Sequence, residues 1–239
     1  MKILAIDSSG LIASAALATE DAVLAEYTTN YKKTHSQTLL PMIDEIVKMT
    51  ETELSELDAI AVTAGPGSFT GLRIGSATAK GLGQALDKPL IAVPTTEALA
   101  WNFCGAEAVI CPLMDARRSQ VYTGLYRWNK ETGAMDCLFA QEAMAVEDII
   151  AEVNRLGQPV IYLGDGADAY RTVLEEKTEV AFSFAPVHMS KQRAASLAVC
   201  AFVYAKEGKM QTAAEFVPTY LRKSQAERER EEKERAEQA

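Results

Sequence analysis

Two acidic residues and one glycine-rich loop are the groups in this sequence whose types and spacing suit chemistry. Asp7 and Asp115 each follow an apolar run that predicts a buried strand. The loop, residues 65–71, lies between the β-branched run 60–63 and a predicted helix over residues 70–86. A strand, a turn and a helix N-terminus present free backbone N–H groups and a positive dipole end. This arrangement therefore suits an anion.

The loop also has a simpler interpretation, as a tight strand-to-helix connection that needs glycine only for its backbone angles. Two familiar motifs do not match it. A phosphate-binding P-loop ends in Gly-Lys-Ser/Thr, whereas Leu72 and Arg73 follow Gly71 here. A serine-hydrolase elbow has a glycine two residues on either side of its serine, and Pro66 and Thr70 occupy those places. The anion site and the tight connection both remain open.

The helix over residues 70–86 carries small residues in two rows, which is unusual because glycine inside a helix costs about 1 kcal/mol relative to alanine. One row recurs every four residues and comprises Gly71, Gly75, Ala79 and Gly83. The second row comprises Ala77, Gly81 and Ala85. Small residues at this spacing allow another helix to approach closely. Packing on the protein's own sheet explains one row more easily than two.

A second helix is predicted over residues 35–50, with Pro41 either bending its first turns or marking its start. Its apolar stripe is wider than one packing contact needs and comprises Leu39, Leu40, Met42, Ile43, Ile46 and Val47. We expect this stripe and the row from Gly71 to Gly83 to form one apolar surface for a partner. An apolar surface of this kind is costly to leave in water.

Composition limits the class of protein. The chain has 239 residues, 48% hydrophobic and 24% charged, with a net charge of -9. The acidic balance argues against a broad basic surface that grips nucleic acid unaided. The four cysteines lack CxxC spacing, no apolar run reaches the roughly 20 residues that span a bilayer, and the N-terminus does not resemble a signal peptide. These features predict a cytoplasmic protein with no membrane association.

The order of predicted elements repeats. The first half has strands over 2–6, 12–18 and 22–29, then the two helices, a strand over 90–93 and a helix over 95–103. The second half has strands over 108–114, 120–128 and 135–140, a helix over 146–156, a strand over 159–163 and a turn at 164–166. We therefore expect lobes over residues 1–104 and 105–222, with a helix over 190–207 that packs back on the first lobe. Residues 223–239 form a charged tail, helical or disordered.

Two βββαβα halves that each place an acid after the first strand resemble the duplicated ribonuclease-H-like lobes of the actin and sugar-kinase superfamily. The resemblance implies an α/β fold in which the two acidic turns face a nucleotide cleft. The residues that match this cleft, in vestigial form, are Asp7, Ser8, Gly65, Gly67, Ser68, Asp115, Gly164 and Gly166.

A narrower resemblance is carried by five motifs, MKILAIDSS, HSQTLLP, AGPGSFTGLRIG, MDARRSQVY and PTYLR, in this order over residues 1–222. Together they resemble the TsaB family, accessory subunits of bacterial tRNA threonylcarbamoyladenosine synthesis. The resemblance implies a heterodimer with the catalytic paralogue TsaD and cooperation with the ATPase TsaE. That assembly transfers threonylcarbamoyl from its adenylate to an adenosine beside the tRNA anticodon.

The resemblance implies that the catalytic paralogues bind a metal through two histidines four residues apart. In this chain the matching places hold Thr95 and Leu99, and leucine cannot ligate a metal. The only histidines, His35 and His188, have no partner at ligand spacing. We therefore expect no metal site and no catalytic residue in this chain, with ATP and metal carried by the partner subunits.

The favoured hypothesis is a non-catalytic subunit that binds a TsaD-like paralogue, meets tRNA through the complex and forms a homodimer when the paralogue is absent. An independent ATP-dependent transferase that uses Asp7, Asp115 and the 65–71 loop is the alternative. A metallopeptidase-like enzyme is a third hypothesis, but no metal pair or nucleophile elbow supports it. Direct tRNA binding through Arg73, Arg117, Arg118 and Arg193 is a further alternative, although scattered arginines usually form salt bridges or stay solvated.

Overall fold

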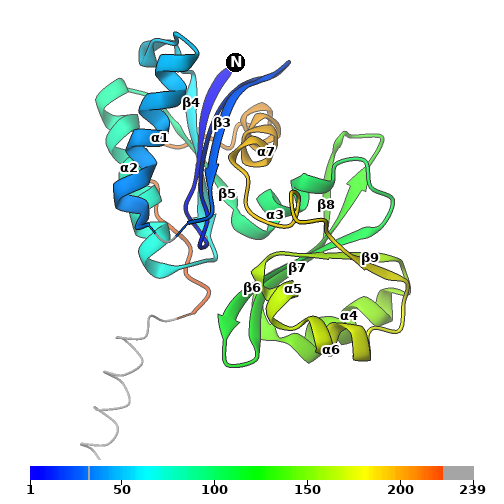
Figure 1. The fold of residues 1–239 in the computed structure, drawn as a ribbon. Coiled ribbons are helices and arrows are strands. Elements are labelled where there is room, and N and C mark those ends of the chain that lie inside the picture. Colours follow the sequence, from blue (N-terminus) through cyan, green and yellow to red (C-terminus); the bar gives the residue numbers. More distant parts are fainter. Residues whose placement is uncertain (32, 223–239) are drawn as a thin grey trace, which may run out of the picture.

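The computed structural model describes residues 1–31 and 33–222, which form two lobes one above the other (Figure 1). Each lobe is built on a five-stranded sheet, with the order β3-β2-β1-β4-β5 in the N-terminal lobe and β10-β9-β6-β7-β8 in the C-terminal lobe. Replacing β1 to β5 by β6 to β10 in the first order gives the second order read from its opposite edge. The predicted duplicated α/β fold is therefore confirmed.

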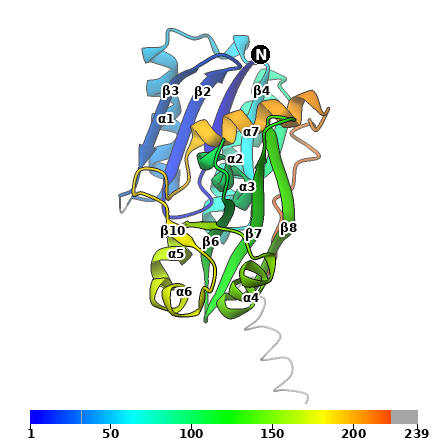
Figure 2. The ribbon, with the colours of Figure 1, turned by 90° about the vertical axis from the view of Figure 1, so that its right-hand side faces the viewer.

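The N-terminal sheet combines an antiparallel meander with a parallel half. The meander comprises β1 (Lys2–Asp7), β2 (Ala13–Thr19) and β3 (Val23–Thr29), and the parallel half adds β4 (Ala59–Gly65) and β5 (Leu90–Pro94). Helices α1 (His35–Met49) and α2 (Phe69–Leu86) cover one face, and α7 (Ala194–Lys206) covers the other (Figures 1 and 2). Alternate side chains of β1, β2 and β4 therefore fill two separate apolar layers.

Local sequence signals explain the bounds of α2. The Ser68 hydroxyl accepts a hydrogen bond from the Gly71 N–H at 3.2 Å, which satisfies one of the unpaired donors of the first turn. Asp87 adopts a left-handed conformation with φ 53° and ends the helix. Helix α1 begins at His35, so Pro41 lies inside it rather than at its start.

The C-terminal sheet repeats the meander and adds shorter elements. Its strands are β6 (Val109–Arg117), β7 (Gln120–Asn129), β8 (Ala134–Ala145), β9 (Val160–Leu163) and β10 (Phe182–Phe184). Helices α4 (Val146–Leu156), α5 (Asp165–Ala169) and α6 (Arg171–Lys177) accompany it, and α3 (Thr95–Ala100) lies between the lobes with the 3₁₀ turn Trp101–Phe103. A second 3₁₀ turn, Leu54–Glu56, precedes β4.

Several bounds differ from those predicted. The helix expected over 95–103 ends at Ala100 and continues as a 3₁₀ turn, and the strand expected over 135–140 extends to Ala145. The helix expected over 190–207 begins at Ala194, after an extended stretch. Helices α5 and α6 and strand β10 were not predicted, because each has seven residues or fewer and no clear period.

The chain returns to the N-terminal lobe after the C-terminal sheet is complete. Helix α7 packs on β1, β2 and β5, and residues 207–222, which we call the C-terminal strap, then run along the edge of that lobe. Within the strap, Gln211 pairs with Leu90 through backbone hydrogen bonds, and the Thr219 N–H donates to the Ala64 carbonyl. The Phe216 carbonyl accepts a hydrogen bond from the Lys80 ammonium at 2.9 Å. The N-terminal lobe thus includes residues from both ends of the described chain.

Within residues 1–31 and 33–222, no helix is long and apolar enough to cross a bilayer. The charged tail predicted over residues 223–239 lies outside the described residues.

Candidate interlobe site

The acid in the turn after β1 is closed off from solvent. The side chain of Asp7 is 1% exposed, and its Oδ1 atom accepts hydrogen bonds from the Ser9 N–H at 2.9 Å, the Ser9 hydroxyl at 2.7 Å and the Thr63 hydroxyl at 3.2 Å. Burial raises the pKa of the Asp7 carboxyl above its usual value, against the lowering effect of these donors. Asp7 is therefore a structural acid that holds its own turn.

The glycine-rich loop is what closes this turn. The Ser68 N–H donates to the Ser9 carbonyl at 2.7 Å, and the Ser8 hydroxyl donates to the Gly71 carbonyl at 2.9 Å. A Cβ atom on Gly71 would lie 2.0 Å from the Ser8 carbonyl oxygen, and one on Gly67 would lie 2.3 Å from that of Ser9. Glycine is thus required for close packing of α2 on the turn, which favours the tight-connection interpretation of the loop.

The corresponding turn after β6 is open. The side chain of Asp115 is partly exposed. Its Oδ1 atom accepts hydrogen bonds from the Arg117 N–H at 2.8 Å and from the Tyr170 hydroxyl at 3.1 Å. The backbone N–H of Asp115 donates to the Asp165 carboxylate at 3.1 Å. Strand β6 continues past Asp115 to Arg117, so the second acid lies inside the strand rather than at its end. Burial raises the pKa of the Asp165 carboxyl, against the lowering effect of the hydrogen bond from the Asp115 N–H and of the Lys191 ammonium.

The glycines of the expected adenosine loop pack on β6. A Cβ atom on Gly164, whose φ is +96°, would lie 2.0 Å from the Leu113 carbonyl oxygen, and one on Gly166 would lie 2.9 Å from it. These two glycines therefore face the strand and contribute no surface to the space between the lobes.

A cavity of about 1130 Å³ lies between the lobes and is lined by Ser9 and Gly10 of the first turn as well as by Asp115 at the second. Of the predicted cleft residues, it is lined by Gly67, Ser68 and Asp115, while Asp7, Ser8, Gly65, Gly164 and Gly166 do not line it. Its other lining residues include Tyr31, Lys33, Phe69, Tyr122, Asp165 and Arg222. Sequence reasoning did not assign these a role, although Tyr122 and Arg222 lie in the MDARRSQVY and PTYLR motifs that carry the family resemblance.

The two positions that match the metal-binding histidines of the catalytic paralogues are buried. Thr95 is fully buried, and Leu99 packs with Ile110, Met114 and Tyr126 at the contact between α3 and the C-terminal sheet. Among the described residues, no group of three His, Cys, Asp or Glu side chains could hold a metal. The His35 ring instead lies 2.8 Å from the Gly10 carbonyl, where it joins α1 to the β1–β2 turn.

The predicted partner surface needs a correction on α2. Gly71, Gly75, Ala79 and Gly83 are all buried inside this chain, against the turn after β1 and the edge of the sheet. The helical period identified two rows of small residues but could not tell which one faces the sheet. The row that faces solvent is the second one, comprising Ala77, Gly81 and Ala85.

The predicted stripe on α1 also lies largely inside the chain. Leu39, Met42, Ile43 and Ile46 are buried in the layer between α1 and the sheet, and Val47 is half-buried beside them. Leu40 is the exception, with 54% of its surface exposed. The stripe is wide because α1 packs on both the sheet and α2.

Comparisons with known proteins agree on one family. The sequence model described as "TsaD: tRNA N6-adenosine threonylcarbamoyltransferase" matches residues 22–230. The tRNA threonylcarbamoyladenosine biosynthesis protein TsaB of Bacillus subtilis is 34% identical over 230 residues, which cover 95% of this chain and 96% of that protein. The chain belongs to the TsaB family. The TsaB of Escherichia coli is 32% identical over 71% of this chain and 74% of its own length.

Solved structures share the fold of this chain. YeaZ from Pseudomonas aeruginosa matches with a TM-score of 0.78 and 28% identity, over 92% of this chain and 99% of that one. A ROK hexokinase from Thermus thermophilus matches with a TM-score of 0.50 and 12% identity, over 87% of this chain and all of the hexokinase chain. The second match shows a shared fold alone, that of the actin and sugar-kinase superfamily.

Proposed function

We propose that this chain is a non-catalytic subunit of tRNA threonylcarbamoyladenosine biosynthesis that pairs with a TsaD-like catalytic paralogue. Its near full-length similarity to a TsaB protein supports the pathway. The observation that carries the non-catalytic role is the closed first turn, in which Asp7 is buried and Gly71 packs directly on Ser8. Ser9 and Gly10 of that turn line the interlobe cavity but Asp7 does not, so phosphoryl or acyl transfer in the cavity lacks the electrostatic support of this carboxylate.

The solvent face of α1 and α2 supports the pairing. The exposed row Ala77, Gly81 and Ala85 leaves α2 almost without side chains on this face, and nothing lies within 4 Å of a Cβ built on Gly81. On α1, Leu40 and Met49 are exposed apolar residues, with 54% and 74% of their surfaces exposed. A partner helix can approach this smooth face closely, and apolar contacts then stabilise the pair.

The remaining components follow from this role. ATP and metal belong to the partner subunits, including a TsaE-like ATPase, and tRNA is modified by the complex in the cytoplasm. Without the paralogue, the same face pairs two copies of this chain, because a two-fold contact uses one patch on both copies.

Co-purification with a tagged TsaD-like paralogue tests the proposal. We expect the two chains to elute together with the mass of a heterodimer. Ala77→Arg should weaken the heterodimer at least tenfold, because it places a long charged side chain on the close-approach face. Ala151→Arg on the exposed side of α4 is the matched control and should bind normally. Equal binding by both variants would place the interface elsewhere.

A second measurement tests the non-catalytic role. The purified chain alone should not hydrolyse ATP or modify tRNA. Turnover by the single chain that Asp7→Ala abolishes would instead support the independent transferase.

A further inference from the structure

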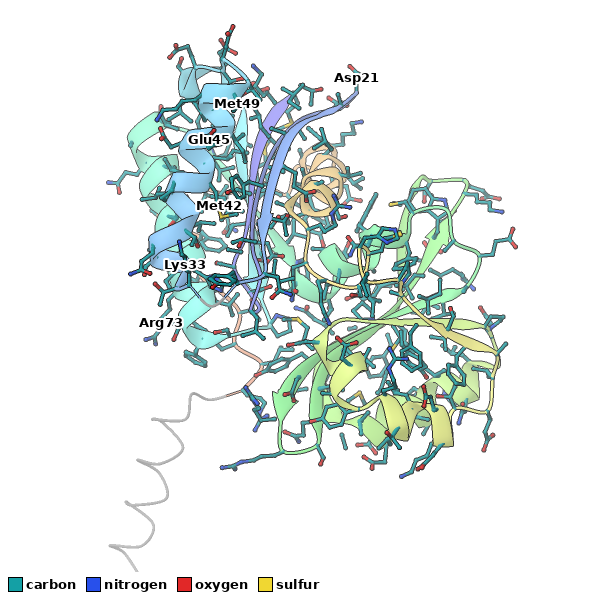
Figure 3. All side chains as sticks on the ribbon, in the orientation of Figure 1. Asp21, Lys33, Met42, Glu45, Met49 and Arg73 are labelled. Carbon is teal, nitrogen blue, oxygen red and sulfur yellow. The ribbon has the colours of Figure 1, made fainter. Side chains whose placement is uncertain are left out.

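Five cations gather at the mouth of the interlobe cavity, and we call them the cationic rim: Lys33, Arg73, Arg117, Arg118 and Arg222. They come from four segments, namely the β3–α1 loop, α2, the β6–β7 hairpin and the C-terminal strap. Lys33, Arg117 and Arg222 line the cavity, and Arg73 lies over the ring of Phe69, which also lines it. Figure 3 shows Lys33 and Arg73 at the same end of the two helices, towards the C-terminal lobe.

The rim is distinctive because its charges are mostly unneutralised on an acidic protein. Most cations of the described residues form ion pairs with carboxylates. The lysines and arginines of residues 1–31 and 33–222 that form none are Lys33, Arg73, Arg118 and Arg222 on the rim, with Lys80 and Lys88 elsewhere. Arg117 has only a 3.7 Å contact with Asp115 and a side chain that is 87% exposed.

Aromatic rings stand among these cations. Phe69 and Tyr220 stack with their centroids 4.2 Å apart and an interplanar angle of 9°, and the Arg73 guanidinium lies 5.3 Å from the Phe69 centroid. Tyr31, next to Lys33 along the cavity wall, is 72% exposed. Cations that follow a phosphate backbone, combined with rings on which bases stack, are the usual components of a single-stranded nucleic-acid site.

We propose that the cationic rim and the exposed rings Tyr31 and Tyr220 bind a single-stranded segment of RNA. This inference rests on the proposed function, in which the RNA is the tRNA that the complex modifies. It assigns to this chain a direct contact with that substrate, in addition to support of the catalytic partner.

The arrangement favours an RNA strand over a free nucleotide. The rim cations are spread across both lobes and do not converge on one point, which suits successive phosphates. The backbone N–H of Ser68, at the start of α2, is already bound to Ser9. Asp115 and Asp165 also line the cavity and repel a phosphate that approaches them, which favours contacts with the rim cations. An acidic protein partner would use the cations but not the ring faces.

Binding of fluorescently labelled, unmodified tRNA to the purified full chain alone tests the inference, with anisotropy measured between 50 and 200 mM salt. We expect weak binding that falls as salt rises. The double variant Arg117→Ala/Arg118→Ala should bind at least tenfold less tightly at low salt. Its slope of log affinity against log salt should be shallower by about 1.4, since each single-strand phosphate contact contributes about 0.7.

Lys130→Ala/Arg155→Ala is the matched control, because it removes two exposed cations from the outer surface of the same lobe. It should keep the slope of the unaltered chain. Tyr31→Ala should weaken binding without changing the slope, since stacking releases no counterions. Circular dichroism confirms that each variant is folded.

Three outcomes would overturn the proposal: no binding of tRNA at 50 mM salt, equal losses in the two double variants, or a rim variant that loses the TsaD-like paralogue while keeping its tRNA affinity. The last outcome would show that the rim is a protein interface. Because this assay contains no paralogue and the heterodimer is tested by Ala77→Arg, failure of one proposal leaves the other measurable.

Discussion

The turn after β1 and the turn after β6 occupy equivalent places in two sheets of the same strand order, yet the acid of the first is sealed and the acid of the second is open to the interlobe cavity. Asp7 is buried under the N-terminus of α2, whereas Asp115 borders a cavity of about 1130 Å³. The two turns show that a repeated strand-and-acid pattern fixes a position in the fold. It does not fix whether that position can meet a ligand.

The glycines that follow each sheet strand account for the difference. In the first lobe Gly71 approaches the turn itself, at Ser8, so α2 sits on top of it. In the second lobe Gly164 approaches Leu113, two residues before the acid, so α5 sits on the strand and leaves the turn uncovered. The β6–β7 hairpin is then free to adopt left-handed conformations at Arg117, Arg118 and Ser119.

Filling the contact at Gly71 should produce the largest effect. Gly71→Val should lower the free energy of unfolding by at least about 3 kcal/mol, because the new side chain overlaps the Ser8 carbonyl and forces α2 off the turn. Urea unfolding measures the loss. Gly81→Ala on the open side of the same helix is the control and should gain about 1 kcal/mol. A stable Gly71→Val protein would mean that the first turn is not sealed.

Removing the charge of Asp7 should produce an effect that depends on pH. Burial raises the pKa of Asp7 in the folded state, so its contribution to stability is full below the ordinary aspartate pKa and is lost as pH rises through the folded value. Asp7→Asn removes this loss. The free energy of unfolding of the variant, relative to that of the unaltered chain, should therefore increase as pH rises. A difference that is constant with pH would contradict the raised pKa.

Relaxing the open turn should produce the smallest effect. Ser119 has φ 57°, a left-handed conformation that costs about 1–2 kcal/mol for a residue with a Cβ. Glycine avoids this cost, but it loses more conformational entropy on folding, which offsets part of the benefit. Ser119→Gly should therefore stabilise the fold by about 0.5 kcal/mol. Urea midpoints compared at constant slope give the value, and a clear loss of stability would show that the serine side chain has a packing role.

The sequence was informative wherever a long segment had one clear period. The strand–loop–helix unit around residues 59–86 and the repeated meander followed from periodicity and turn chemistry. The family followed from motifs spread over most of the chain. These signals are local, so each can be identified without knowledge of its neighbours.

The candidate site was predicted poorly because its parts meet only through long-range contacts. Nothing local indicates that Gly71 packs on Ser8, or that Tyr220 stacks on Phe69. The strap that brings Arg222 to the Ala116 carbonyl has no period of its own. The exposed face of α2 was assigned to the wrong row for the same reason, since the sequence gives the rows but not the position of the sheet.

Helix α7 has a consequence for how the chain matures during synthesis. One face of the N-terminal sheet is covered by Ala194, Leu197, Ala198, Ala201 and Phe202, which leave the ribosome after the whole C-terminal sheet. Residues 109–184, by contrast, are continuous and complete their own sheet. Although domains generally fold in order of synthesis, the first lobe of this protein is finished last. Its half-covered sheet is exposed to chaperones and proteases until the closing helix arrives.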